Sequence, residues 1–274
     1  MNTPALTLAA VLIFAGASDA QNTGLRRLTQ RDQIFGWEAV GRVDLGMNGY
    51  CTGTLIATDL VLTAAHCLYN GAAAHAPRDP ANMRFRAGLT DGQVIAERGV
   101  AAAVAHPGYT ADAPISARNV QHDLALLQLD SPIPAALAAP FAVNPPGPKG
   151  TSVSVVSYAQ GRSDALSWQR VCTVFGRTKG LVGFDCDVDF GSSGAPVFDR
   201  SGTRPRIVSV VSAGARSATG TRAWGMELPA LLAELKAALR AGRGVLTPGQ
   251  TPHTTLKSKP APARRSNGAK FLRP

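Results

Sequence analysis

The chain has 274 residues, of which 45% are hydrophobic, and a formal net charge of +10 at pH 7. This length accommodates one large β domain or two small lobes with a core, and outside the N-terminus no apolar run reaches the roughly eighteen residues that a membrane-spanning helix needs. Seven basic residues and no acidic residue lie between residues 241 and 274, so composition requires no basic groove for nucleic acid in the rest of the protein.

Residues 1–20 have the features of a secretory signal peptide. An apolar stretch covers residues 6–14, and small residues follow it, so that cleavage after Ala17 or Ala20 fits. A buried N-terminal helix is the alternative. Residues 21–33 are polar and are expected to form a flexible leader or short propeptide, with regular structure starting near Ile34. The sequence thus predicts a secreted protein, extracellular or periplasmic.

Short segments rich in Val, Ile and Thr fill the middle of the chain and are separated by Gly, Pro, Asn and Asp turns. This spacing predicts an all-β fold. A Pro-rich joint at residues 144–148 divides the strands into two sets. We therefore expect one β-barrel over residues 34–143 and a second over residues 144–226.

One helix is predicted at residues 227–242, where apolar side chains recur at helical spacing after Glu227. This helix is expected to pack on the second barrel. Residues 243–274 are rich in Pro, Lys, Arg, Ser and Thr and have little to bury. They are predicted to be a disordered basic tail, and deletion of residues 247–274 is expected to leave folding and activity nearly unchanged.

The segment 191–196 has the sequence GSSGAP and follows an acidic run at residues 185–189. Glycines tolerate the backbone angles that direct successive N–H groups into one small space. With Gly191 and Ser193 as backbone donors, this space is a candidate oxyanion hole, and the Ser193 hydroxyl is a candidate nucleophile. Taken alone, the hexapeptide is more typical of a structural loop.

His66 lies in the segment 62–67, LTAAHC. An unperturbed imidazole has a pKa of about 6.5, so a histidine is neutral near pH 7 and accepts a hydroxyl proton. We predict that His66 is the general base, the alternative being a core histidine.

Asp123 lies in the segment 122–127, HDLALL, directly before an apolar strand. A buried carboxylate needs a partner, and the Nδ1–H of His66 is one that also sets the imidazole tautomer. Asp123 is therefore predicted to orient His66, although an isolated acid here would be interpreted as a strand-start cap.

Four cysteines occur in two pairs that are close in sequence, with no Cys-x-x-Cys metal motif. A Cys51–Cys67 bridge closes the ring that carries His66, and such a ring stabilises a fold by roughly 3 kcal/mol in the chain-entropy model. Cys172 and Cys186 are expected to form the second bridge. Disulfides are consistent with export.

The segments 62–67, 122–127 and 191–196, in that order along the chain, resemble the chymotrypsin-like (trypsin-like) serine endopeptidases, in the bacterial secreted branch that includes glutamyl endopeptidases. The resemblance covers roughly residues 34–239. It implies two six-stranded Greek-key barrels with a C-terminal helix, a triad of His66, Asp123 and Ser193 between them, and hydrolysis of peptide bonds through an acyl-enzyme. It also implies that residues 209–214 form the strand along which the substrate backbone pairs.

The resemblance further implies that Ser212, Ala213 and Gly214 line the pocket for the residue before the scissile bond. Asp187, six residues before Ser193, corresponds to the acid of trypsin-type pockets and predicts a preference for Arg or Lys. Glutamate preference is the rival, weakened because Val188 and Val211 stand where some of those enzymes have a hydroxyl residue and a histidine. A third interpretation is that Asp187 only holds its loop by hydrogen bonds.

Ser192 stands where animal relatives have the Asp that binds a newly formed N-terminus, so activation by that ion pair is not expected. The remaining histidines are predicted to have no catalytic role, and they are His75, His106, His122 and His253. No cofactor and no metal site are predicted. The expected partners are protein or peptide substrates, with no specific nucleic acid, and the protein is expected to be monomeric.

Two other classes of function compete with the peptidase. A catalytically inactive homologue could use the same fold as a binding module. Alternatively, the basic tail could carry the function by binding a polyanion or a cell surface.

Overall fold

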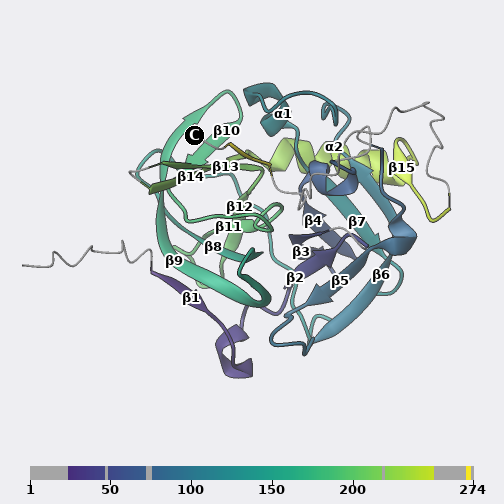
Figure 1. Ribbon diagram of the computed structural model, residues 1–274, viewed down its shortest axis with the longest axis horizontal. Helices are drawn as coiled ribbons and strands as arrows, with labels where there is room; N and C mark the ends of the chain where they lie inside the picture. Colours follow the sequence, from purple (N-terminus) through teal and green to yellow (C-terminus); the bar gives the residue numbers. More distant parts are fainter. Residues whose placement is uncertain (1–23, 47–48, 72–75, 218–219, 250–269, 273–274) are drawn as a thin grey trace, which may run out of the picture.

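The computed structural model describes residues 24–46, 49–71, 76–217, 220–249 and 270–272. These residues form two β-barrels that lie side by side, and a helix follows the second barrel in the chain (Figure 1). The strands are β1 (Leu25–Arg27), β2 (Val40–Asp44), β3 (Tyr50–Ala57), β4 (Leu60–Thr63), β5 (Arg84–Ala87), β6 (Ala96–Ala105), β7 (Ala125–Leu129), β8 (Ser152–Ala159), β9 (Arg162–Thr178), β10 (Leu181–Phe184), β11 (Pro196–Asp199), β12 (Arg206–Val210), β13 (Ala213–Ser217), β14 (Gly220–Met226), β15 (Val245–Leu246) and β16 (Lys270–Leu272). The helices are η1 (Arg31–Ile34), η2 (Ala65–Leu68), η3 (Pro80–Asn82), α1 (Ala117–Gln121) and α2 (Pro229–Arg240).

The first barrel is a closed ring of six strands in the order β6-β5-β2-β3-β4-β7, because β6 also pairs with β7. Closure leaves no free sheet edge in this ring. The apolar β4 is buried along its whole length, and η2, the turn that carries His66, follows it. The barrel thus gives the His66 segment a rigid base.

The second barrel has the strand order β12-β11-β8-β9-β10-β14. A hydrogen bond of 2.8 Å from Ser209 Oγ to the carbonyl oxygen of Met226 connects β12 with β14. The next strand, β13, pairs with β14 and extends the sheet beyond the barrel. The predicted pair of six-stranded barrels is therefore confirmed.

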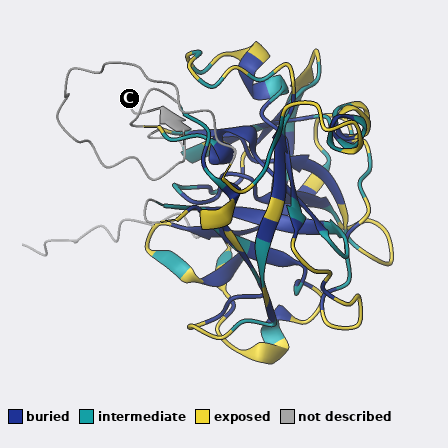
Figure 2. Cartoon of the chain, turned by 90° about the vertical axis from the view of Figure 1, so that its right-hand side faces the viewer, coloured by how far each residue is buried: buried dark blue, intermediate teal, exposed yellow. Residues whose placement is uncertain are grey.

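Aromatic side chains join the two barrels. The ring of Trp37, which precedes β2, lies 5.0 Å from that of Phe198 in β11, and Phe198 lies 4.7 Å from Phe141 in the connecting segment, between ring centroids. Figure 2 shows that the buried residues follow the strands, whereas exposed residues gather at turns and helix surfaces. One continuous core includes residues of both barrels, so the segments at their junction are held firmly.

The helix α2 forms at the predicted place but packs on the other barrel. Its buried residues Leu232, Leu235 and Ala238 join the core of the first barrel, and α2 contacts β6 and β7. The following strand β15 pairs with β6, which keeps this part of the chain on the first barrel. The expectation that the helix packs on the second barrel is wrong, because helical spacing identifies a buried stripe but not its partner.

Both ends of the chain are more structured than the sequence indicated. The β1 strand pairs with β9, and Leu28 is buried, so structure begins before Ile34. Beyond residue 242, β15 and β16 are paired strands, where no structure was expected. The predicted signal peptide and residues 250–269 lie outside the described residues. Within the described part of the chain, no helix is long and apolar enough to cross a membrane.

Candidate active site

The imidazole of His66 is held from one side by a buried carboxylate. Its Nδ1 lies 2.6 Å from Oδ2 of Asp123, and the backbone N–H of His66 donates to Oδ1 of the same residue over 2.8 Å. Both side chains are only 3% exposed. Two contacts from one carboxylate fix the ring, and with the proton on Nδ1 the other nitrogen, Nε2, has a lone pair.

Asp123 also accepts a hydrogen bond of 2.5 Å from the Ser212 hydroxyl at the start of β13. Burial by itself raises the pKa of a carboxyl group, but the charge of His66 and the hydrogen bonds from His66 and Ser212 outweigh it. The pKa of Asp123 therefore lies below its ordinary value. The carboxylate stays ionised and is tied to both halves of the molecule, since Ser212 belongs to the second half.

Ser193 lies in the turn that precedes β11, and the first barrel holds this turn in place. The backbone N–H of Thr52 in β3 donates to the Ser193 carbonyl oxygen over 2.8 Å, and the Thr52 hydroxyl donates to the Gly191 carbonyl oxygen over 2.9 Å. The backbone N–H of Tyr158 donates to the same hydroxyl over 3.0 Å. Thr52 thus connects the Ser193 turn to both barrels through buried contacts.

Glycine is required on both sides of this serine. Gly191 and Gly194 have φ values of 95° and 78°, which L-residues rarely adopt. A Cβ on Gly194 would collide with Thr52 and Thr63, and one on Gly191 would collide with the Tyr50 ring. The Ser193 turn therefore packs directly against the strand that leads to His66.

Three groups in two segments, η2 and the Ser193 turn, make no hydrogen bond within the described part of the chain. His66 Nε2 is buried and makes no hydrogen bond there, and the backbone N–H groups of Gly191 and Ser193 donate to no group there. A free imidazole acceptor can take a proton, and two free donors can stabilise negative charge on an attacked carbonyl. The arrangement has the elements needed for nucleophilic acyl transfer.

Ser192 is fully buried. Its hydroxyl donates to the Ser157 hydroxyl over 3.3 Å and lies 3.3 Å from the backbone nitrogen of Asp189, from which it accepts. Position 192 therefore has a neutral hydroxyl and no carboxylate that could form an ion pair with an N-terminal ammonium group.

Both predicted disulfides are present, Cys51–Cys67 and Cys172–Cys186. The first connects β3 to η2, the two elements that carry Thr52 and His66. Cys51, His66 and Cys67 place potential metal-ligand atoms within 4.8 Å of one another. Because both sulfurs are in a disulfide, they are not thiolate ligands, and this cluster does not fit a metal ion.

The predicted pocket residues lie together beside β13. Ala213 and Gly214 pair with Trp224 and Ala223 of β14. The Asp187 carboxylate accepts a hydrogen bond of 3.3 Å from Thr221 Oγ1 and lies 4.0 Å from the Arg216 guanidinium. It is therefore near the predicted place, but an arginine of the same chain already faces it.

A second acid and a second arginine complete this charged group. Arg216 donates to Asp189 Oδ2 over 3.0 Å. Burial lowers the pKa of the half-buried Arg162, and the nearby charges of Asp187 and Asp189 oppose that effect. Two acids and two arginines thus interact with one another beside β13, and Asp187 is not an isolated carboxylate.

The other histidines that the structure describes are occupied elsewhere. His106 Nδ1 accepts from the Gly108 N–H over 3.1 Å, and His106 Nε2 lies 3.1 Å from Glu234 Oε2 in α2. His122 Nδ1 lies 2.8 Å from the Arg118 carbonyl oxygen. The predicted residues His75 and His253 lie outside the described residues.

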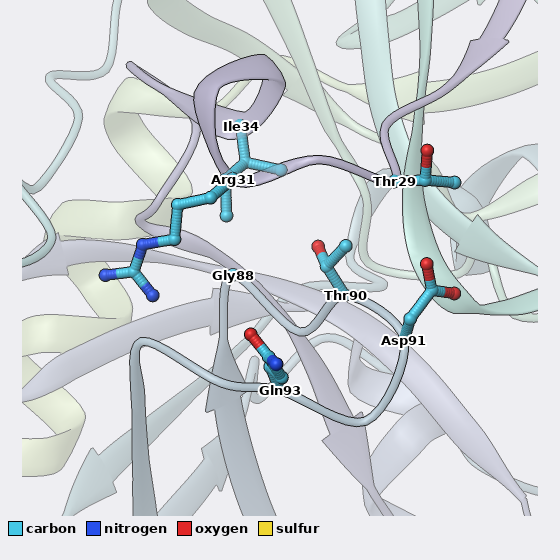
Figure 3. A pocket seen from close by; sticks show the side chains of 7 residues that line it. All are labelled: Thr29, Arg31, Ile34, Gly88, Thr90, Asp91 and Gln93. Carbon is cyan, nitrogen blue, oxygen red and sulfur yellow. The ribbon is translucent and has the colours of Figure 1, made fainter.

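A cavity of about 140 Å³ lies between the N-terminal segment and the turn after β5 (Figure 3). Its lining residues are Thr29, Arg31, Ile34, Gly88, Thr90, Asp91 and Gln93. His66, Asp123 and Ser193 do not line it, so this cavity is not part of the candidate site. A much smaller cavity, about 10 Å³, is lined by Tyr109, Asp123 and Ser212 among others.

Sequence reasoning missed the roles of Thr52 and Arg216. Thr52 directly follows a cysteine in an apolar strand, and no local pattern indicates that its hydroxyl reaches Gly191. The contact between Arg216 and Asp189 depends on how β13 and the 187–190 segment approach each other. The only sequence signal for Thr52 is a weak one: it follows Cys51 in the disulfide-closed loop that contains His66.

Comparisons with solved structures agree with this architecture. A Glu endopeptidase solved in complex with MPD matches with a TM-score of 0.65 and 21% identity, covering 80% of this chain and 97% of that chain. A thermostable serine protease from an extremophilic microorganism matches with a TM-score of 0.59 and 19% identity, covering 74% and 97%. The protease Anisep from Arthrobacter nicotinovorans matches with a TM-score of 0.58 and 20% identity, covering 73% and 95%.

At these identities the solved structures show the shared fold. The family itself is shown by sequence, because the trypsin-like peptidase domain matches residues 51–204, a span that contains His66, Asp123 and Ser193. The chain belongs to the trypsin-like peptidase family of serine-type endopeptidases.

Proposed function

We propose that this protein hydrolyses peptide bonds through an acyl-enzyme on Ser193. His66 Nε2 takes the Ser193 hydroxyl proton as the oxygen attacks the scissile carbonyl, and it then gives that proton to the leaving amine. Water attacks the acyl ester in the second half of the reaction, with His66 again as base. The observation that carries this proposal is the buried Nδ1–Oδ2 contact of 2.6 Å between His66 and Asp123, which leaves Nε2 free.

Asp123 and the Ser193 turn supply the remaining functions. Asp123 keeps the proton on Nδ1 and stabilises the imidazolium that forms during proton transfer. The N–H groups of Gly191 and Ser193 stabilise the oxyanion, which is worth about 3 to 4 kcal/mol per donor in related sites. Thr52 holds both carbonyl groups of this turn, so the donors are oriented before substrate binds.

Reaction with a fluorophosphonate tests the nucleophile. We expect one label per chain on Ser193, and Ser193→Ala should be unlabelled and lose about 10⁵- to 10⁶-fold in kcat on a peptide ester. Ser192→Ala is the matched control, since Ser192 is buried beside Ser193 but its hydroxyl bonds to Ser157 and Asp189 and to neither His66 nor Asp123. A folded wild type without label would favour the inactive homologue instead.

We further propose a preference for Arg or Lys before the scissile bond. Asp187 and Asp189 place two carboxylates beside β13, and a substrate cation can replace Arg216, whose side chain is 61% exposed. Val188 and Val211 are buried and offer no polar group to a glutamate. Acidic preference is the second candidate, because Arg162 and Arg216 also border this group.

A panel of chromogenic peptides that differ only before the scissile bond distinguishes these candidates. Higher kcat/KM for Arg and Lys, lost in Asp187→Asn, supports the first; higher kcat/KM for Glu, lost in Arg216→Gln, supports the second. Equal rates for Arg, Glu and Leu would contradict both. Asp164→Asn is the control, since Asp164 binds Arg27 on the other side of this barrel.

Secretion is also part of the proposal. All four cysteines form disulfides, which persist in oxidising compartments such as the periplasm or the extracellular space. N-terminal sequencing of the protein recovered from periplasm and medium is the test, and a start shortly after Ala17 or Ala20 is expected. Retention of residue 1 in a cytosolic, reduced protein would contradict it.

A further inference from the structure

The end of the chain lies on the edge of the second sheet. The β16 strand runs parallel to β13, with Lys270 opposite Ala213, Phe271 opposite Gly214 and Leu272 opposite Ala215. β13 is bordered by β14 on its other side, so β16 covers the edge that β13 would otherwise leave open. An open strand edge is a template for an added extended segment.

This edge belongs to the proposed substrate site. β13 begins next to Ser212, whose hydroxyl binds the catalytic Asp123, and it then runs away from the triad. Ala213 and Gly214 are the residues proposed to pair with substrate. A substrate backbone and β16 need the same N–H and C=O groups of β13, so only one of them pairs at a time.

The direction of β16 distinguishes it from a substrate. The acyl part of a substrate precedes the scissile bond, so when it pairs along β13 its chain must run toward the triad, antiparallel to β13. β16 is parallel to β13, and from Lys270 to Leu272 its chain runs away from the triad end. It occupies the edge without presenting a peptide bond in the productive direction.

We propose that residues 270–272 form an intramolecular inhibitor that covers the substrate-pairing edge of β13. The start of the tether is fixed on the first barrel, because β15 pairs with β6 and the Gly249 N–H lies 3.3 Å from the Asp79 carboxylate. A tethered segment has an effective concentration on the order of millimolar, which suffices for three residues that bind weakly. Substrate or a partner that binds the tail then releases the site.

This inference rests on the proposed function and differs from the expectation that tail deletion leaves activity unchanged. Full-length protein should be compared with a chain that ends at Gly249 and with full-length Phe271→Pro, which removes a backbone N–H and disfavours strand pairing. We expect both changes to raise kcat/KM on a peptide ester about three- to thirtyfold, chiefly through a lower KM. A chain that ends at Leu272 is the matched control and should behave as full-length protein.

A synthetic peptide of residues 264–274 provides the complementary measurement. Added to the chain that ends at Gly249, it should inhibit competitively at about millimolar concentration, whereas the same peptide with Phe271→Pro should not. Active sites are counted by fluorophosphonate labelling, and mass spectrometry verifies that each tail is intact. If no chain is labelled, the proposed function fails; if all are labelled and their kcat/KM values agree within about twofold, the inhibitor is refuted.

Discussion

Two buried histidines in the first barrel each face a carboxylate, but the surroundings of the two pairs differ. His66 contacts Asp123, which is as buried as the ring itself, and its second nitrogen is free in the described structure. His106 contacts Glu234, whose side chain is 63% exposed, and its second nitrogen accepts from Gly108. In the described structure the two histidines therefore differ in the burial of the acid and in whether the second ring nitrogen has a partner.

This difference is the reason that we propose a chemical role for one pair and a packing role for the other. A carboxylate removed from water interacts strongly with an imidazolium, so we expect Asp123 to stabilise a positive charge on His66. Glu234 is solvated, and its charge is screened. Its contact with His106 connects α2 to the segment that follows β6. We expect no proton transfer at His106 during the reaction.

The largest effect should follow from the buried acid. Asp123→Asn keeps the shape of the contact but favours the wrong imidazole tautomer, and we expect kcat on a peptide ester to fall about 10³- to 10⁴-fold. Glu234→Gln makes the same chemical change beside His106 and should leave kcat within about twofold. Steady-state kinetics near pH 8 measure both. Equal losses in the two variants would show that burial of the acid does not separate the two histidines.

The sequence predicted the parts of this site that depend on local pattern. His66, Asp123 and Ser193 lie in short segments with distinctive neighbours, and the two disulfides follow from short rings. The sharp turn around Ser193 was indicated by its glycines, because positive φ angles favour glycine. These predictions needed no knowledge of how the barrels meet.

What the sequence left open depends on contacts between distant segments. Ser212 was expected to line the pocket, but nothing in the sequence indicated that its hydroxyl donates to Asp123, 89 positions away. Arg216 faces Asp187 and Asp189 only because β13 lies beside their loop, and the tail pairs with β13 after a long gap in sequence. Charge and apolar spacing indicate that such residues have a partner in the folded protein. They do not indicate which element provides that partner.

An intermediate effect should come from Ser212, which donates a hydrogen bond to the carboxylate of the proposed catalytic pair. Ser212→Ala removes a hydrogen bond to a buried charge, worth about 1.5 to 3 kcal/mol, so kcat/KM should fall about 10- to 100-fold. Ser209→Ala is the matched control, because its hydroxyl is equally buried but binds the Met226 carbonyl oxygen. It should lower the free energy of unfolding and leave kcat/KM nearly unchanged. Loss of kcat/KM in Ser209→Ala alone would overturn the role of Ser212.

The smallest effect concerns the structural histidine and appears in stability rather than rate. Burial lowers the pKa of His106 in the folded protein, the charge of His122 adds to this, and Glu234 opposes it. The unfolded chain, with an ordinary histidine pKa of about 6.5, therefore binds the proton first as pH falls. The stability that His106 contributes is present above pH 6.5 or so and is lost below it.

His106→Gln tests this sign in a Ser193→Ala background, which prevents self-digestion during urea unfolding. At pH 8 the variant loses the contacts to Gly108 and Glu234 and should be about 1 to 2 kcal/mol less stable. Toward pH 5 the difference from His106 protein should shrink, because only the latter is destabilised by protonation. In the protein that keeps His106, Glu234→Gln should make the free energy of unfolding fall more steeply as the pH decreases. The reason is that this variant lacks the carboxylate that favours the imidazolium. If the stability difference between the two proteins instead widens toward pH 5, Glu234 has a larger effect than burial on the pKa of His106. Both histidines would then form ion pairs with their carboxylates.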